Sequence, residues 1–150
     1  MPLSESSTTA PSSSQGHTLG VFEGETDVGT VNLPGSTTYD ADQQTYTIAG
    51  GGANIWADHD DFHFVWKRMR GNFIVSTRAD FIGTGVEPHR KLGWMARTNL
   101  DTSSANVNAG VHGDGLTSLQ FRRSMGGPTE EVRSSLVGAD VIQLERRGNT

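Results

Sequence analysis

Residues 55–81, IWADHDDFHFVWKRMRGNFIVSTRADF, decide the fold class because they contain two short stretches in which apolar and polar residues alternate. In an extended chain successive side chains point to opposite faces, so the aromatic residues at positions 62, 64 and 66 share one face. Residues 73–81 repeat the alternation after a turn-forming Arg-Gly-Asn at 70–72. We therefore predict a β-hairpin with an apolar side and a polar side, and the polar side carries His63 and Arg78.

Glycine recurs at short intervals from residue 20 onward, which leaves room for strands and for few helices. The segments between the glycines predict nine strands, at residues 36–39, 45–49, 62–67, 73–81, 91–98, 105–111, 117–123, 131–136 and 141–147. Residues 38–47 resemble a hairpin with a longer loop. Many short strands separated by turns are typical of an antiparallel β-sandwich, and we expect one of jelly-roll type.

At 150 residues the chain fits one domain. Residues 1–19 are rich in Ser, Thr and Pro, so we expect a disordered leader there, followed by the sandwich module at 20–150. The strand predicted at 141–147 has no strand after it to pair with. Because an unpaired edge strand leaves backbone donors and acceptors exposed, we expect the module to lack its last strands.

Charge and composition exclude several kinds of partner. The formal charge of -5 and the pI near 5.4 argue against nucleic-acid binding, which needs clustered Lys and Arg. The absence of cysteine excludes disulfides and thiolate metal sites. No apolar run has the length of a membrane span, and the N-terminus lacks the basic and apolar regions of a secretory signal. We expect no membrane insertion, and composition leaves the compartment open.

Four phrases of the sequence resemble a known family. They are DVGTVNLPGSTTYD, YTIAGGGANIWADHDDFHFVWKRMRGNF, RKLGWMARTNLD and HGDGLTSLQFRR, and together they span much of residues 21–149. They are similar to the concanavalin A-like, laminin-G-like jelly-roll module of bacterial exported proteins, some of which carry a TolB-like propeller after it. The resemblance implies carbohydrate binding or adhesion without catalysis, a periplasmic or extracellular location, and further strands or a propeller after residue 150.

Alternation within the predicted strands also suggests a binding surface. Several predicted strands carry polar side chains at alternate positions. If these strands are neighbours in one sheet, the polar side chains fall on a single face, and an exposed aromatic residue lies near that face. The candidate ligand-binding residues are Trp56, His63, Arg78, Arg97, Gln120 and Arg122. The guanidinium groups of Arg and the amide group of Gln can form hydrogen bonds with sugar hydroxyls, and an indole ring can stack on a sugar ring. The alternative is a solvated sheet face in which these groups pair with Asp80, Glu87 or Asp101.

Acidic residues just before residue 62 are weak candidates for a metal site. Asp58, Asp60 and Asp61 stand beside His59 and His63 and have the oxygen ligands that Ca²⁺ prefers, but the spacing of a calcium loop is missing. The simpler interpretation is that the acids accept backbone N–H bonds in the turn before the strand. We therefore predict no cofactor. The one exception is Ca²⁺, for which these acids could serve as ligands.

The sequence also predicts two loops. Residues 112–115, His-Gly-Asp-Gly, are interpreted as a plain hairpin turn, and the longer loop at 83–90 could gate a groove at the sheet rim. No pair of strand carboxylates and no nucleophile elbow points to an enzyme. The prediction is a non-catalytic carbohydrate-binding module. The alternatives are a fragment of a glycoside-processing enzyme and a structural or interaction module without a small ligand.

Overall fold

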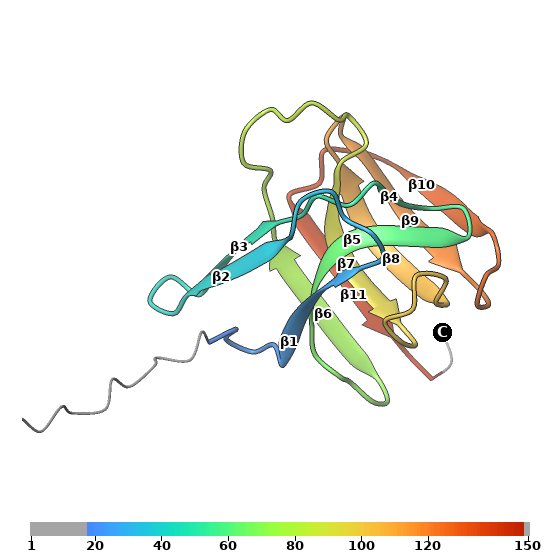
Figure 1. Cartoon of the computed structure of the whole chain (residues 1–150), viewed down its shortest axis with the longest axis horizontal. Coiled ribbons are helices and arrows are strands. Elements are labelled where there is room, and N and C mark those ends of the chain that lie inside the picture. The colour runs from blue at the N-terminus through green and yellow to red at the C-terminus, as the bar shows by residue number, and fades with distance from the viewer. Residues whose placement is uncertain (1–17, 149–150) are drawn as a thin grey trace, which may run out of the picture.

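The computed structural model describes residues 18–148 of the chain. These residues form eleven β-strands and no helix, and every strand pairing is antiparallel (Figure 1). The strands are β1 (Gly24–Val28), β2 (Ser36–Asp40), β3 (Thr45–Ala49), β4 (Asn54–Trp56), β5 (His59–Trp66), β6 (Phe73–Arg78), β7 (Lys91–Arg97), β8 (Asn106–His112), β9 (Leu116–Arg122), β10 (Thr129–Val137) and β11 (Val141–Arg146). The predicted all-β, antiparallel sandwich class is confirmed. The leader predicted at 1–19 lies outside the described residues except for positions 18 and 19.

The largest sheet has four strands in the order β10-β9-β8-β7, and its consecutive strands are joined as hairpins. Lys91 pairs with His112 at one end of the β7–β8 ladder, and Arg97 pairs with Asn106 at the other. Three smaller sheets, β1-β5-β4, β11-β6 and β2-β3, surround it. The hairpin predicted at residues 38–47 is present as β2 and β3.

The hairpin predicted between residues 62–67 and 73–81 is wrong. β5 pairs with β1 and β4, whereas β6 pairs with β11, so residues 67–72 connect two different sheets. Alternation fixes which face a side chain takes but not which strand lies alongside, because pairing depends on distant segments. The expectation that the C-terminal strand finds no partner is also wrong, since β11 pairs with β6 along all six of its residues.

The apolar core lies where β11 contacts β7 and β8. Ile142 and Leu144 of β11 and Val111 of β8 are buried, and so is Val28 of β1. Phe22 brings its ring within 6.2 Å of the Trp94 ring, which adds an aromatic contact beside β7. Residues 18–148 contain no helix that could cross a bilayer.

One face of the four-stranded sheet is unusual because it is both polar and largely buried, while the opposite face carries Val111 of the apolar core. We call the first of these faces the polar face. Its residues are Lys91, Met95 and Arg97 of β7, Asn106, Asn108 and His112 of β8, Ser118, Gln120 and Arg122 of β9, and Thr129 and Glu131 of β10. Most of these side chains are buried, whereas Leu119 and Val132 on the opposite face are 38% and 60% exposed. Buried polar groups need hydrogen-bond partners, so the question for this sheet is which groups, from the protein or from a ligand, pair with the polar face.

Candidate functional site

One end of the polar face is closed by a buried ion-pair cluster. Asp60, at the start of β5, reaches between two arginines of the sheet and is fully buried. Arg122 binds both of its carboxylate oxygens, with Nη1 to Oδ2 at 2.9 Å and Nη2 to Oδ1 at 2.7 Å. Arg97 approaches Oδ2 at 3.4 Å, and the amide of Asn106 donates to the same atom at 3.3 Å. This bidentate pair joins β5 to the four-stranded sheet.

The burial of this cluster corrects part of the predicted ligand surface. Arg122 is 1% exposed, and its remaining donors go to backbone carbonyls such as those of Ala57 and Ser104. The Arg97 side chain is also almost completely buried, and burial lowers the pKa of its guanidinium. Both arginines share one sheet face, as expected, but neither has surface left for a sugar. Neither arginine is free because Asp60, which lies 62 residues before Arg122 in the sequence, is their buried counter-ion.

Two of the three acids proposed as calcium ligands, Asp60 and Asp61, are held by protein groups. Asp60 is paired with two guanidinium groups, which repel a metal ion. Asp61 accepts the backbone N–H of Thr30 at 2.8 Å and lies 3.0 Å from His59 Nε2. Asp58 is exposed in the turn between β4 and β5. The turn interpretation is wrong for Asp60, whose carboxylate accepts from the side chains of Arg122 and Asn106. The acid that accepts a backbone N–H is Asp61.

His63 belongs to a separate buried network on β1 and β5. Its Nδ1 lies 2.9 Å from Asp27 Oδ1, and its Nε2 lies 3.0 Å from Thr37 Oγ1 and 3.2 Å from Glu25 Oε2. The order Thr–His–Asp resembles a hydrolase triad, but Thr37 is 2% exposed and a substrate could not reach its hydroxyl. The network holds β1 and β2 to β5, so the predicted role of His63 in ligand contact is replaced by a structural one.

The remaining predicted site residues are spread over different sheets. Trp56, in β4, is 41% exposed, in agreement with its expected place on the surface. Arg78, in β6, is exposed and pairs with Asp140 at 3.0 Å, so it does not share a sheet with His63 or with the polar face. The expected single patch of six residues is not assembled. Gln120 alone of the six combines a place on the polar face with an atom that lacks a protein partner.

The polar face contains polar atoms without protein partners, one near its middle, on Gln120, and one at its end, on His112. Gln120 is 3% exposed; its Nε2 donates to Glu131 at 2.9 Å, but its Oε1 is buried and accepts no hydrogen bond within residues 18–148. His112 is 5% exposed, and its Nδ1 is likewise buried and unpaired among the described residues. Such atoms are rare in native proteins. Ser118 Oγ is a third one on this face, and the side-chain nitrogens of Trp66, Arg90 and Trp94 are others elsewhere in the described residues. The polar face therefore holds half of them and is a candidate binding region.

The ionisable groups around these atoms have pKa values that are shifted from their ordinary values. Burial lowers the pKa of Lys91, whose ammonium group also donates to the Asn54 side chain of β4. Burial and the nearby Lys91 lower the pKa of His112, which favours a neutral imidazole. Burial alone would raise the pKa of Glu131, but hydrogen bonds from Gln120 and Arg133 outweigh it and lower the pKa. The region thus offers an amide, a neutral imidazole, an ammonium and a carboxylate.

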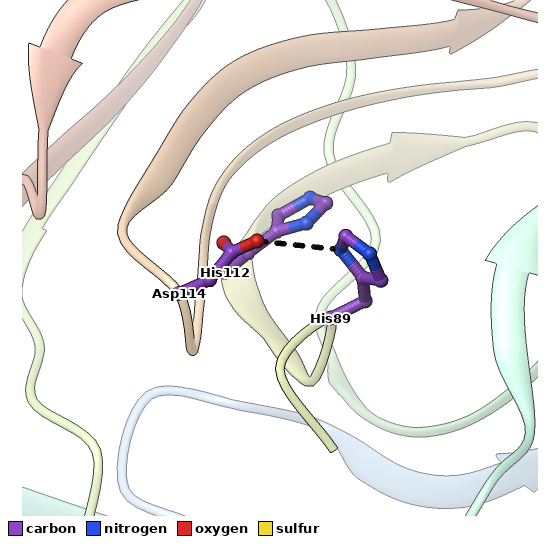
Figure 2. Close-up of side chains that lie close together, drawn as sticks. All are labelled: His89, His112 and Asp114. Atoms are coloured by element: carbon purple, nitrogen blue, oxygen red, sulfur yellow. Dashed lines mark ion pairs between the residues drawn. The ribbon is translucent and has the colours of Figure 1, made fainter.

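A group that sequence reasoning missed lies at the end of the same face, where the loop before β7 meets the β8–β9 turn. His89, His112 and Asp114 each offer a ligand atom, and these atoms all lie within 4.8 Å of one another (Figure 2). His89 Nδ1 and Asp114 Oδ2 are 3.6 Å apart. The turn at 112–115 is more than a plain hairpin connection, because it brings two potential metal ligands to the loop predicted at the sheet rim.

Comparisons with family models, with curated proteins and with solved structures find no match to this chain. The class that the fold and the site define is therefore that of an all-β, antiparallel sandwich with a buried polar sheet face.

Proposed function

We propose that this chain is a non-catalytic binding module whose ligand is a carbohydrate bound on the polar face. The observation that carries the proposal is the pair of buried atoms without protein partners, Gln120 Oε1 and His112 Nδ1, on one sheet face. An amide oxygen and a ring nitrogen can accept hydrogen bonds from hydroxyl groups, and each sugar ring carries several hydroxyl groups. Gln120 is paired with Asn108, four residues along β8 from His112, so two separate ligand hydroxyls would be needed to satisfy the two atoms. Both atoms are buried, so side chains over the polar face would have to move aside to admit the ligand, and the new hydrogen bonds would offset the cost of leaving the atoms unpaired.

Groups beside these atoms suit the same ligand class. The carboxylate of Glu131 and the ammonium of Lys91 add an acceptor and donors on the same face. Asn54 of β4 contacts Lys91, and the backbone carbonyl of Trp56 accepts from Arg122, so the strand that carries the exposed Trp56 lies beside the polar face. An indole ring can stack on the apolar face of a sugar ring.

The resemblance to concanavalin A-like, laminin-G-like modules supports the same ligand class and a jelly-roll connectivity. It also supports a periplasmic or extracellular location, with a TolB-like propeller or further strands as neighbours in a longer protein. These features belong to the proposal as what the resemblance implies.

Glycan-array binding by the untagged chain, followed by calorimetric titration of the best ligand, tests the proposal. Trp56→Ala and Gln120→Leu should each weaken binding by about 5- to 30-fold, because a lost buried hydrogen bond or ring contact costs about 1–2 kcal/mol. Arg78→Ala is the matched control, since Arg78 is exposed on a different sheet and should not affect binding. Thermal melting of each variant separates lost binding from lost folding. A wild-type chain that retains no glycan on the array would refute the proposal.

One observation favours a second function, that of an interaction module without a small ligand. Leu119 and Val132 are opposite each other on β9 and β10, and both are exposed on the face away from the polar one. Apolar pairs of this kind can mark a contact with another protein surface. Sedimentation equilibrium at rising concentration should then show self-association that Leu119→Ser with Val132→Ser removes. A wild-type chain that stays monomeric would count against self-association through this face.

A further inference from the structure

We propose that His89, His112 and Asp114 form a binding site for a divalent transition-metal ion, with Zn²⁺ as the best fit. The site shares His112 with the proposed carbohydrate surface, so zinc and a ligand hydroxyl would compete for its Nδ1. It is separate from residues 58–61, where sequence reasoning looked for a metal. Two imidazoles and one carboxylate are ligand types that zinc prefers, and three protein ligands leave one tetrahedral position open. Calcium fits poorly, because it takes six to eight oxygen ligands.

Ligand spacing is close to that of a zinc site. Ligand atoms at about 2.0–2.1 Å from zinc in tetrahedral geometry are about 3.3 Å from one another. His89 Nδ1 and Asp114 Oδ2 are 3.6 Å apart, and the whole set lies within 4.8 Å. A contraction of at most about 1.5 Å therefore completes the geometry, and side-chain rotation of the two exposed members, His89 and Asp114, can supply it.

The two loops are held together by their backbones, which orients the ligands in advance. Gly113 N–H donates to Arg90 O and Asp114 N–H donates to Pro88 O, both at 2.8 Å, so the bonds flank His89 on each side. A Cβ atom at Gly113 would come within 2.8 Å of the Arg90 side chain and 3.2 Å of Pro88 O. A larger residue would force the Arg90 side chain and the Pro88 carbonyl to shift, so glycine favours this approach, and the approach places His89 near the other two ligands.

Hydrogen bonds also select the ligand atom of the carboxylate. Asp114 Oδ1 accepts the backbone N–H of Leu116 at 3.0 Å, which leaves Oδ2 directed toward His89. The backbone N–H of His89 donates to Glu87 Oε1 at 2.9 Å and fixes the start of its side chain. Partners of this kind orient metal ligands in known sites.

His112 provides the second, independent sign of a ligand. Its side chain is buried, and its Nδ1 has no hydrogen-bond partner within the described residues. Among surrounding charges, Lys91 disfavours a bound cation, whereas Asp114 and Glu131 favour it. A metal ion would supply the partner that this buried imidazole lacks.

Isothermal titration of the untagged chain with ZnCl₂, and with CaCl₂ as the comparison, measures the site directly. Zinc should bind with one-to-one stoichiometry and calcium should not bind. Co²⁺ in place of zinc should give visible absorption bands typical of four-coordinate geometry. His89→Ala and Asp114→Asn should each weaken zinc binding by at least about 10-fold, because even outer-shell partners are worth about 10–100-fold.

His59→Ala is the matched control, since His59 is an exposed histidine 3.0 Å from an aspartate, Asp61, at another place on the molecule. This variant should bind zinc as the wild type does. Circular dichroism checks the fold of each variant, and the two ligand substitutions are at exposed positions. Zinc binding that is absent, or that survives both ligand substitutions, or that falls equally in His59→Ala, would overturn the proposal.

Discussion

Replacing Arg122 by methionine removes the bidentate partner of Asp60 and tests whether the buried cluster is structural. Breaking a buried pair by removing one partner costs about 3–5 kcal/mol. Arg97 at 3.4 Å and the Asn106 amide at 3.3 Å remain beside the Asp60 carboxylate, so we expect about 3 kcal/mol for Arg122→Met. Asp60→Asn leaves two buried guanidinium groups without an anion, so it should cost more, about 5 kcal/mol.

Equilibrium denaturation in urea, followed by tryptophan fluorescence, gives these free energies of unfolding. For a chain of this size they correspond to a fall in Tm of about 6–20 °C. Arg78→Met is the control, because the exposed pair of Arg78 with Asp140 is worth about 0–1 kcal/mol. If Arg122→Met were as stable as the wild type, the argument from burial would fail. If that stable variant also lost glycan binding, Arg122 would regain the ligand role that its burial argues against.

Three further predictions concern the strands around β5 and the apolar core. Gly35→Ala should cost about 1–3 kcal/mol by urea denaturation, because a Cβ atom there would come within 2.1 Å of the His63 ring; an unchanged midpoint would contradict this contact. Hydrogen bonds from His63 and from the Gly35 N–H lower the pKa of Asp27, so its stabilisation is complete above the ordinary pKa of 3.8 and is lost as pH falls through the lowered value. The stability difference between wild type and Asp27→Asn should therefore shrink on acidification from pH 6 to pH 3, and a constant difference would exclude this linkage. Leu144→Ala should cost about 2–5 kcal/mol in thermal or urea unfolding, whereas Ile74→Ala on the neighbouring strand should cost far less because Ile74 is exposed; equal losses would misplace the core.

Local patterns were sufficient to place most strands and their faces. Phe73 and Val75 share the inward face of β6, as alternation predicts, because side-chain direction follows from the extended backbone alone. Pairing was not predictable in the same way. The short link after residue 66 looked like a hairpin turn, but β6 gains its partner from β11, far along the chain.

Sequence reasoning also placed the polar residues of β7 and β9 on one face and then misjudged its exposure. Polar residues in alternation normally face water, and no local signal shows that Asp60 inserts a counter-ion between Arg97 and Arg122. The His89–His112 group was within reach of sequence. Since adjacent strands 91–98 and 105–111 form a hairpin, residues just before the first and just after the second must lie side by side.

The pairing of β6 with β11 has a consequence for the order of folding. The backbone N–H of Gly148 donates to the side chain of Asn72, a contact that spans 76 residues. The β7–β10 hairpins need only neighbouring segments and can form early, whereas β6 must wait until residues 141–146 are available. Closing so long a loop is slow and entropically costly. A nascent chain would therefore hold the inward face of β6 uncovered until β11 emerges from the ribosome.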